Sequence, residues 1–151
     1  MARWPRGEAE IEGLIARGEL QKVTGAAADG RPQVARSAVT LQSAAALIES
    51  DPDSAFILSY DAARQALTAL LAHQGLRPTT KGGHLAVEQA VLAQFGTGFR
   101  QFGALRRRRN ELEYPQWAGA EADADEGRDS VSSAREIPQA SEKLIERLGL
   151  F

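Results

Sequence analysis

Cysteine is absent from this 151-residue chain, so the protein can form neither a disulfide nor a thiolate metal site. Histidine is nearly absent, and the two that occur, His73 and His84, do not have the spacing of metal ligands. Glycine-rich phosphate loops of the Walker type and serine nucleophile elbows are missing as well. We therefore expect no bound metal and no cofactor.

Long hydrophobic runs are also lacking. No apolar run approaches the roughly 18 residues that a membrane-spanning helix needs, and none near the N-terminus has signal-peptide length. These absences predict a soluble cytoplasmic protein without membrane contact. The chain has no excess of positive charge either, since 18 Lys and Arg are set against 20 Asp and Glu, for a net charge of −2. Any contact with nucleic acid must therefore come from a local patch.

The chain does have the composition of an ordinary globular domain, with 43% hydrophobic and 25% charged residues. Its length suits a single compact domain with a real core. Within that domain we expect two parts. Residues 1–32 hold a loose tail, a short helix and a linker, and residues 33–151 form a helical bundle.

Apolar residues recur at helical spacing along the bundle. Over residues 33–50 the repeating positions are Val34, Ala38, Leu41, Ala45 and Ile48. Asp51 before Pro52 is a strong helix-start signal, and it opens the longest predicted helix, residues 52–74. Further helices are expected at 84–95, 97–115 and 129–148, with loops at 75–83 and 116–128, and Pro138 predicts a kink or a late start. No window alternates with period two. The predicted fold is therefore all-α, an antiparallel bundle of about five helices with a long central hairpin.

Four consecutive arginines, Arg106 to Arg109, give the strongest local signal. At about 100° per residue the four side chains face different directions. Arg109 falls within an apolar stripe whose other members are Phe102, Leu105 and Leu112. A second stripe, bordered by Arg106, consists of Arg107, Asn110 and Tyr114. The helical wheel therefore predicts that Arg109 points to a core or an interface, whereas the other three arginines can be solvated.

Arg109 has two interpretations. An unpaired buried guanidinium is very costly, so it needs acceptors, and Glu113 lies one turn further along the helix. The first interpretation is a structural ion pair with Glu113. The second is an arginine held at a dimer interface or in a cleft, where it binds phosphate. Four arginines beside a tyrosine also suit RNA phosphates and base stacking, although charge runs are usually solvated faces.

The two histidines differ in position. His73 lies near the end of the long helix, where a histidine favours the helix dipole, so we interpret it as structural. His84 opens the next helix after Thr-Thr-Lys-Gly-Gly. It either caps that helix and packs, which is the commoner role for an isolated histidine, or forms a hydrogen bond with a facing helix.

Three stretches together resemble the HEPN superfamily (higher eukaryotes and prokaryotes nucleotide-binding domains). Residues 55–75, AFILSYDAARQALTALLAHQG, are similar to the long central helix of the family. Residues 81–91, KGGHLAVEQAV, are similar to its Lys-x-His-x-Leu helix start. Residues 109–114, RNELEY, lie at the place of its Arg-x4–6-His motif. The resemblance covers residues 35–148, and it implies a small all-α bundle, often dimeric, of the kind found in prokaryotic toxin–antitoxin and defence systems.

The resemblance also implies roles for particular residues. In active members, arginine and histidine from two protomers meet at the dimer interface and cleave RNA without a metal. Arg109 corresponds to the motif arginine and Asn110 to the polar residue beside it, but Tyr114 occupies the place of the motif histidine. A tyrosine side chain, with an ordinary pKa of about 10, is a poor general base at neutral pH. It can still orient a ribose hydroxyl or stack on a base, and His84 is the remaining source of an imidazole.

Three hypotheses follow. The first is a non-catalytic or weakly catalytic HEPN-like homodimer that binds RNA or a nucleotide, and its binding residues are Arg106, Arg107, Arg109, Asn110 and Tyr114. The second is a metal-independent endoribonuclease toxin, countered by an antitoxin protein, in which Arg109 stabilises the transition state and Tyr114 or His84 completes the catalytic site. The third is a structural bundle that binds a protein partner. The missing proton-transfer residue favours the first.

Overall fold

The computed structural model describes residues 2–151 and is mostly helical, which confirms the all-α prediction. Its elements in chain order are α1 (Glu8–Ala16), β1 (Leu20–Lys22), a 3-10 turn (Gly25–Ala28), α2 (Arg31–Ala46), α3 (Pro52–His73), β2 (Leu76–Pro78), α4 (Gly83–Phe95), a second 3-10 turn (Gly96–Phe99), α5 (Gln101–Glu113) and α6 (Ala124–Ile145). None of the helices in this range combines the length and apolar character needed to cross a membrane.

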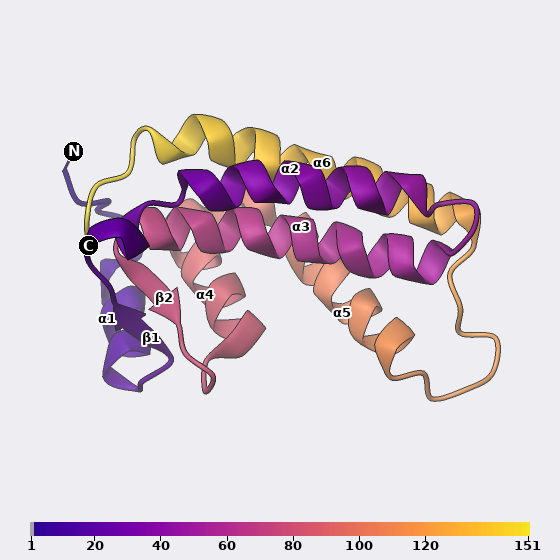
Figure 1. Ribbon diagram of the computed structural model, residues 1–151. Coiled ribbons are helices and arrows are strands. Elements are labelled where there is room, and N and C mark those ends of the chain that lie inside the picture. Colours follow the sequence, from indigo (N-terminus) through magenta and orange to yellow (C-terminus); the bar gives the residue numbers. More distant parts are fainter. Residues whose placement is uncertain (1) are drawn as a thin grey trace.

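The three long helices α2, α3 and α6 lie side by side, and α4 and α5 extend from the opposite side of α3 (Figure 1). Helix α3 is therefore covered from both directions. It starts as the sequence predicts, because the Asp51 carboxylate accepts a hydrogen bond from the Ser54 backbone N–H and Pro52 occupies the first turn. Many of its buried residues are alanines, whose small side chains let neighbouring helices approach closely.

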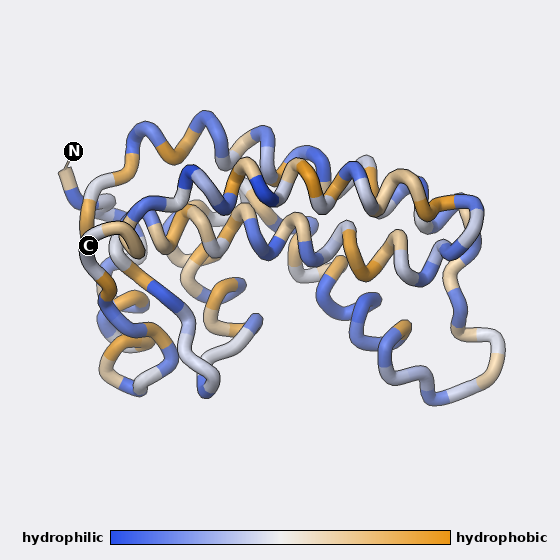
Figure 2. Tube along the Cα trace, viewed as in Figure 1, coloured by the Kyte–Doolittle hydropathy of each residue, from blue (hydrophilic) through white to orange (hydrophobic). Residues whose placement is uncertain are grey.

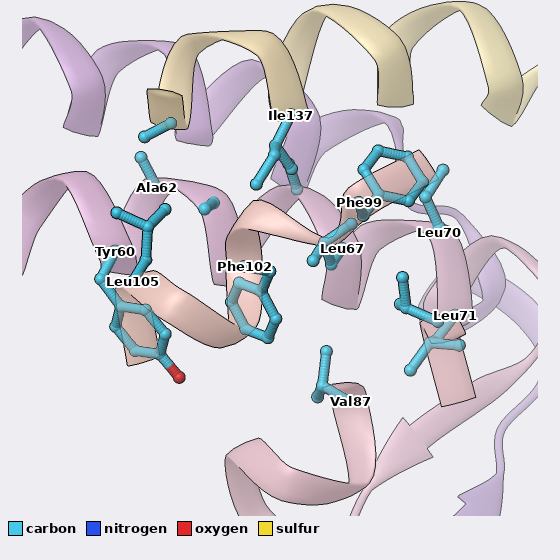
Figure 3. Packing of buried hydrophobic residues seen from close by; sticks show 14 of the residues in the cluster. Tyr60, Ala62, Leu67, Leu70, Leu71, Val87, Phe99, Phe102, Leu105 and Ile137 are labelled. Atoms are coloured by element: carbon cyan, nitrogen blue, oxygen red, sulfur yellow. The ribbon is translucent and has the colours of Figure 1, made fainter. Parts of the chain in front are cut away.

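One hydrophobic core joins the helices of both sides. Tyr60 and Leu67 of α3 belong to it, and both are completely buried. The Tyr60 ring stacks on Phe102 of α5, with ring centres 5.3 Å apart and planes 11° from parallel (Figure 3). This stack joins α5 to α3, and Arg109, two turns beyond Phe102, lies over the same Tyr60 ring.

The N-terminal segment is attached more firmly than we expected. Residues Leu20–Lys22 pair with Leu76–Pro78 as a short antiparallel ladder, so part of the predicted 75–83 loop is a strand. Three residues are too few for a period-two pattern to be recognisable. The predicted loose tail is also wrong, because the Trp4 indole N–H donates to the Gln94 carbonyl at 2.9 Å and its ring packs on Phe95.

The last helix begins earlier than predicted. Asp123 accepts a hydrogen bond from the Glu126 backbone N–H and starts α6 within the stretch expected to be loop. Acidic residues such as Asp125 are stabilising in the first turn of a helix, which explains why this small, acidic sequence is helical. Pro138 lies buried inside the continuous helix, so the alternative of a late start is wrong.

Candidate functional site

Helix α5 lies against α3 and α6. Its buried side chains include Phe102, Leu105 and Leu112, the apolar stripe that the wheel predicts. Most of the second half of α5 is hydrophilic, with one hydrophobic position near its end, as the colouring of Figure 2 shows. The four arginines thus lie on a helix that is firmly packed along one side only.

Arg109 lies at the edge of that packed side, with 17% of its side chain exposed. Its Nη2 is 2.7 Å from a Glu113 carboxylate oxygen, and its Nη1 donates to the Asn110 side-chain oxygen at 3.2 Å. The guanidinium carbon is 5.7 Å from the centre of the Tyr60 ring. The Nε–H is buried and has no hydrogen-bond partner among the described residues. The structural ion pair with Glu113 is therefore present, and one donor of Arg109 remains unsatisfied.

Two of the other arginines are held by carboxylates, contrary to the expectation that they are solvated. Arg106 forms a salt bridge with Glu88 of α4, and Arg108 forms one with Glu126 of α6. Only 23% and 24% of these two side chains are exposed. A wheel of one helix does not show charges that neighbouring helices contribute. Arg107 is exposed, and no ion pair is found for it within residues 2–151.

His84, at the start of α4, points toward α3. Its Nδ1 lies 2.8 Å from the Tyr60 hydroxyl oxygen, and the two rings are 5.5 Å apart. Helix α4 has no side-chain cap. Of the two interpretations of His84, the structure therefore shows the hydrogen bond to a facing helix. Arg109 and His84 both contact Tyr60, from α5 and α4 respectively, but no hydrogen bond joins them to each other in the part of the chain that the structure describes.

The protonation states of this pair follow from their surroundings. Burial raises the pKa of Tyr60 to about 12, so the phenol keeps its proton at neutral pH. Burial, followed by the positive charges of Arg64 and Arg109, lowers the pKa of His84, so the imidazole is neutral. A buried hydroxyl that donates to nothing would cost free energy, so we assign its proton to the bond with Nδ1. The neutral ring then carries its own proton on Nε2, where it is a hydrogen-bond donor.

Two polar residues of α3 complete the cluster. The side chains of Asp61 and Arg64 are 28% and 30% exposed. Arg64 Nη2 lies 3.9 Å from Asp61 Oδ1, which is a long contact for an ion pair. Burial raises the pKa of Asp61, against the lowering effect of Arg64, Arg109 and His84. The Nε–H of Arg64 is buried and, like that of Arg109, has no partner among residues 2–151. We call Tyr60, Asp61, Arg64, His84 and Arg109 the α3 cluster.

The sequence identifies only part of this cluster. It singles out Arg109 and His84, but not the α3 residues that bring them together. The signal for Asp61 and Arg64 is the polar stripe on α3 that contains them, whereas Tyr60 lies on the buried face of that helix and gives no such signal. A polar stripe by itself is ordinary for an amphipathic helix, so it becomes informative only once α4 and α5 are known to lie over it.

The remaining predicted site residues lie elsewhere on α5. Arg107, Asn110 and Tyr114 are all exposed, as expected for the second stripe of the wheel. Tyr114 is 70% exposed at the C-terminal end of α5, and its hydroxyl forms no hydrogen bond within the described residues. The predicted site is thus divided into the α3 cluster and an exposed stripe. Asn110 connects the two through its contact with Arg109.

Comparison with known proteins adds nothing to this picture, because no family model, no curated protein and no solved structure matches the chain.

Proposed function

We propose that this chain is a HEPN-like, homodimeric helical module that binds RNA or a nucleotide without cleaving it. The observation that carries the proposal is the pair of buried, unpartnered Nε–H groups of Arg64 and Arg109, which come from two different helices. An unsatisfied buried donor costs about 1–3 kcal/mol, and more on a charged group. A phosphate oxygen can accept from an arginine Nε–H, so a phosphate bound at either arginine would remove that cost once the side chain turns toward it.

The tautomer of His84 supports binding rather than catalysis. With Nδ1 occupied by the Tyr60 hydroxyl, the neutral ring presents a donor, which can bind a phosphate or ribose oxygen but cannot take up a proton. A general base needs a free lone pair within reach of the proton that it removes. Tyr114 does not replace the missing base, because it lies on the exposed stripe and not in the α3 cluster.

Exposed apolar residues on α4 support the dimer. Leu85 follows His84 directly, and it is 50% exposed, while Leu92, two turns further along the same helix, is 56% exposed. A second copy of the chain placed against this side of α4 would cover both leucines and would border the α3 cluster. The family resemblance likewise implies a dimer, with Arg109 at its interface.

The proposal is tested by measuring the affinity for a fluorescently labelled single-stranded RNA by anisotropy. We expect Arg109→Ala to weaken binding at least about tenfold, because a hydrogen bond to a charged group is worth about 1.5–3 kcal/mol. Arg109→Lys should weaken it as well, since lysine keeps the charge but lacks the Nε–H. Arg36→Ala is the matched control, because Arg36 is an exposed arginine on α2, away from the cluster. Equal effects of Arg109→Ala and Arg36→Ala would contradict the proposal.

A metal-independent endoribonuclease is the second candidate, and it is favoured by the position of His84, which lies with Arg109 around the Tyr60 ring, so that an imidazole and a guanidinium are close together. Incubation of RNA with the purified protein in EDTA separates the two. Cleavage by the parent, but not by Arg109→Ala, would replace the binding proposal with the enzymatic one. A search for an antitoxin partner would then follow.

A further inference from the structure

Two exposed aromatic residues lie at and just beyond the C-terminal end of α5, and the sequence singles out only the first of them, Tyr114. Nine aromatic residues occur in the chain, and seven of them lie in the core or pack against it. The other two, Tyr114 and Trp117, are 70% and 60% exposed. Both line one hollow of about 460 Å³, together with Asn110, Glu111 and Gln116. An exposed aromatic pair in a shared hollow needs an explanation that core packing does not supply.

The loop that carries Trp117 is attached at its C-terminal end, three and five residues beyond the indole. Arg108 donates to the Ala120 carbonyl at 2.9 Å, and Ala122 donates its backbone N–H to Asp53 of α3 at 2.7 Å. The Ala120 side chain is buried, with 6% exposed. These contacts attach the end of the loop to α5 and α3, which reduces the conformational entropy that the loop loses when Trp117 binds a ligand.

We propose that Tyr114 and Trp117 form a subsite for one unpaired base of a single-stranded RNA, an inference that rests on the proposed function and specifies its ligand. Aromatic rings stack on any nucleobase, because every base has a π-face. The side-chain amides of Asn110 and Gln116 supply donors and acceptors for the edge of that base. The hollow opens outward, so it suits a base that has left its strand and excludes one that is paired in a duplex.

The charged residues around the hollow define a path for the RNA backbone along α5. Arg107 lies seven residues before Tyr114 on the same stripe, about 10 Å along the helix axis, and is exposed without an ion pair within residues 2–151. Glu111 and Glu126 are both held by Arg108, which reduces the repulsion that they exert on a phosphate. A strand with a base in the hollow therefore passes its backbone over Arg107 and Asn110 toward the α3 cluster.

The test compares two ligands of equal length by anisotropy, an oligouridine and the same ribose-phosphate chain without bases. We expect Trp117→Ala and Tyr114→Ala each to weaken oligouridine binding about 5- to 150-fold, the range for loss of one stacked base, and to leave binding of the abasic chain unchanged. Arg109→Ala should weaken both ligands. Leu150→Ala, which removes another exposed apolar side chain, serves as the control and should change neither.

The outcomes separate this inference from the proposed function. Two outcomes would overturn the base subsite and leave phosphate binding intact. In the first, Trp117→Ala weakens binding of both ligands equally. In the second, Trp117→Ala changes the binding of neither ligand, while Arg109→Ala still weakens it. No binding of either ligand by the parent would overturn both. Dissociation of a parent dimer by Trp117→Ala, seen in sedimentation velocity without loss of RNA affinity, would assign the aromatic pair to a protein contact instead.

Discussion

Replacing Tyr60 with phenylalanine removes one hydroxyl group from the centre of the α3 cluster. The hydroxyl oxygen lies 2.8 Å from Nδ1 of His84, whereas the ring stacks on Phe102 and is completely buried. Phenylalanine keeps the ring and its stacking but loses the hydrogen bond. Tyr60→Phe therefore isolates the contribution of that bond to stability and to the protonation of His84.

The expected cost is modest. A neutral hydrogen bond contributes about 0.5–1.5 kcal/mol net, and His84 is only partly buried, so water can reach its freed nitrogen. For a chain of this size, each kcal/mol corresponds to a change in Tm of about 2–4 °C. The pKa of His84 should rise in the variant, because the hydroxyl donates to the neutral ring and stabilises it against protonation.

Two measurements check this reasoning. Urea unfolding followed by circular dichroism gives the free energy, and NMR titration of the histidine ring protons gives the pKa. The chain has only two histidines, so His73→Gln assigns the signals. Tyr114→Phe is the matched control, since it removes the other tyrosine hydroxyl from an exposed position and should change neither quantity.

An unchanged pKa of His84 in Tyr60→Phe would refute the hydrogen bond and, with it, the tautomer on which the non-catalytic proposal depends. A fall in the pKa would show that the ring donates to the hydroxyl, which leaves a lone pair on Nε2 and revives the enzymatic candidate. A loss of more than about 3 kcal/mol would mean that the core repacks around the new side chain.

Three further predictions concern stability. Gly30→Ala should lower the free energy of unfolding in urea by about 1–3 kcal/mol or more, because the new Cβ would lie 1.9 Å from the Ala69 carbonyl oxygen. Gly98→Ala is the control and should lower it far less, because the space around Gly98 is open. The pKa of His84 is lower in the folded chain than in the unfolded one, so the unfolded chain binds the proton more readily. The free energy of unfolding should therefore decrease as the pH falls from about 6.5 through the pKa of folded His84. His84→Gln should flatten this part of the plot of unfolding free energy against pH. Arg108→Ala should cost about 1–2 kcal/mol and increase hydrogen exchange in the 114–123 loop, and unchanged exchange there would contradict its anchoring role.

The parts of the fold that the sequence predicts are those determined by local signals. The start of α3 depends on Asp51 and Pro52, which are adjacent to it, and its burial follows from a repeat within one helix. The pairing of Leu20–Lys22 with Leu76–Pro78 depends instead on contacts between distant segments, and neither segment has a recognisable pattern of its own. The early start of α6 could have been predicted, because Asp123 followed by Glu126 is a helix-start signal that the acidic, small-residue composition obscured.

In the candidate site, too, the features within one helix are predictable from the sequence and those that join different helices are not. The wheel predicts the buried stripe of Phe102, Leu105 and Leu112 correctly, because all three lie on one helix. It does not predict that Tyr60 joins Arg109 to His84, since these residues come from three helices. The sequence does not single out Trp117 for a different reason, because this residue lies in a loop and the hollow that it lines is formed by that loop together with the end of α5.

Four consecutive arginines suggest a strongly basic patch, yet the fold does not produce one. Successive residues turn by about 100°, so each arginine meets a different neighbour, and three of the four meet carboxylates. Long-range attraction of a polyanion is therefore weak, because most of the positive charge is already balanced within the chain. What remains is short-range: the exposed Arg107, and the unpartnered N–H groups of Arg64 and Arg109. If the chain binds nucleic acid as we propose, these groups would distinguish ligands by fit at a few atoms and not by total charge, which would favour a short flexible strand over a long duplex.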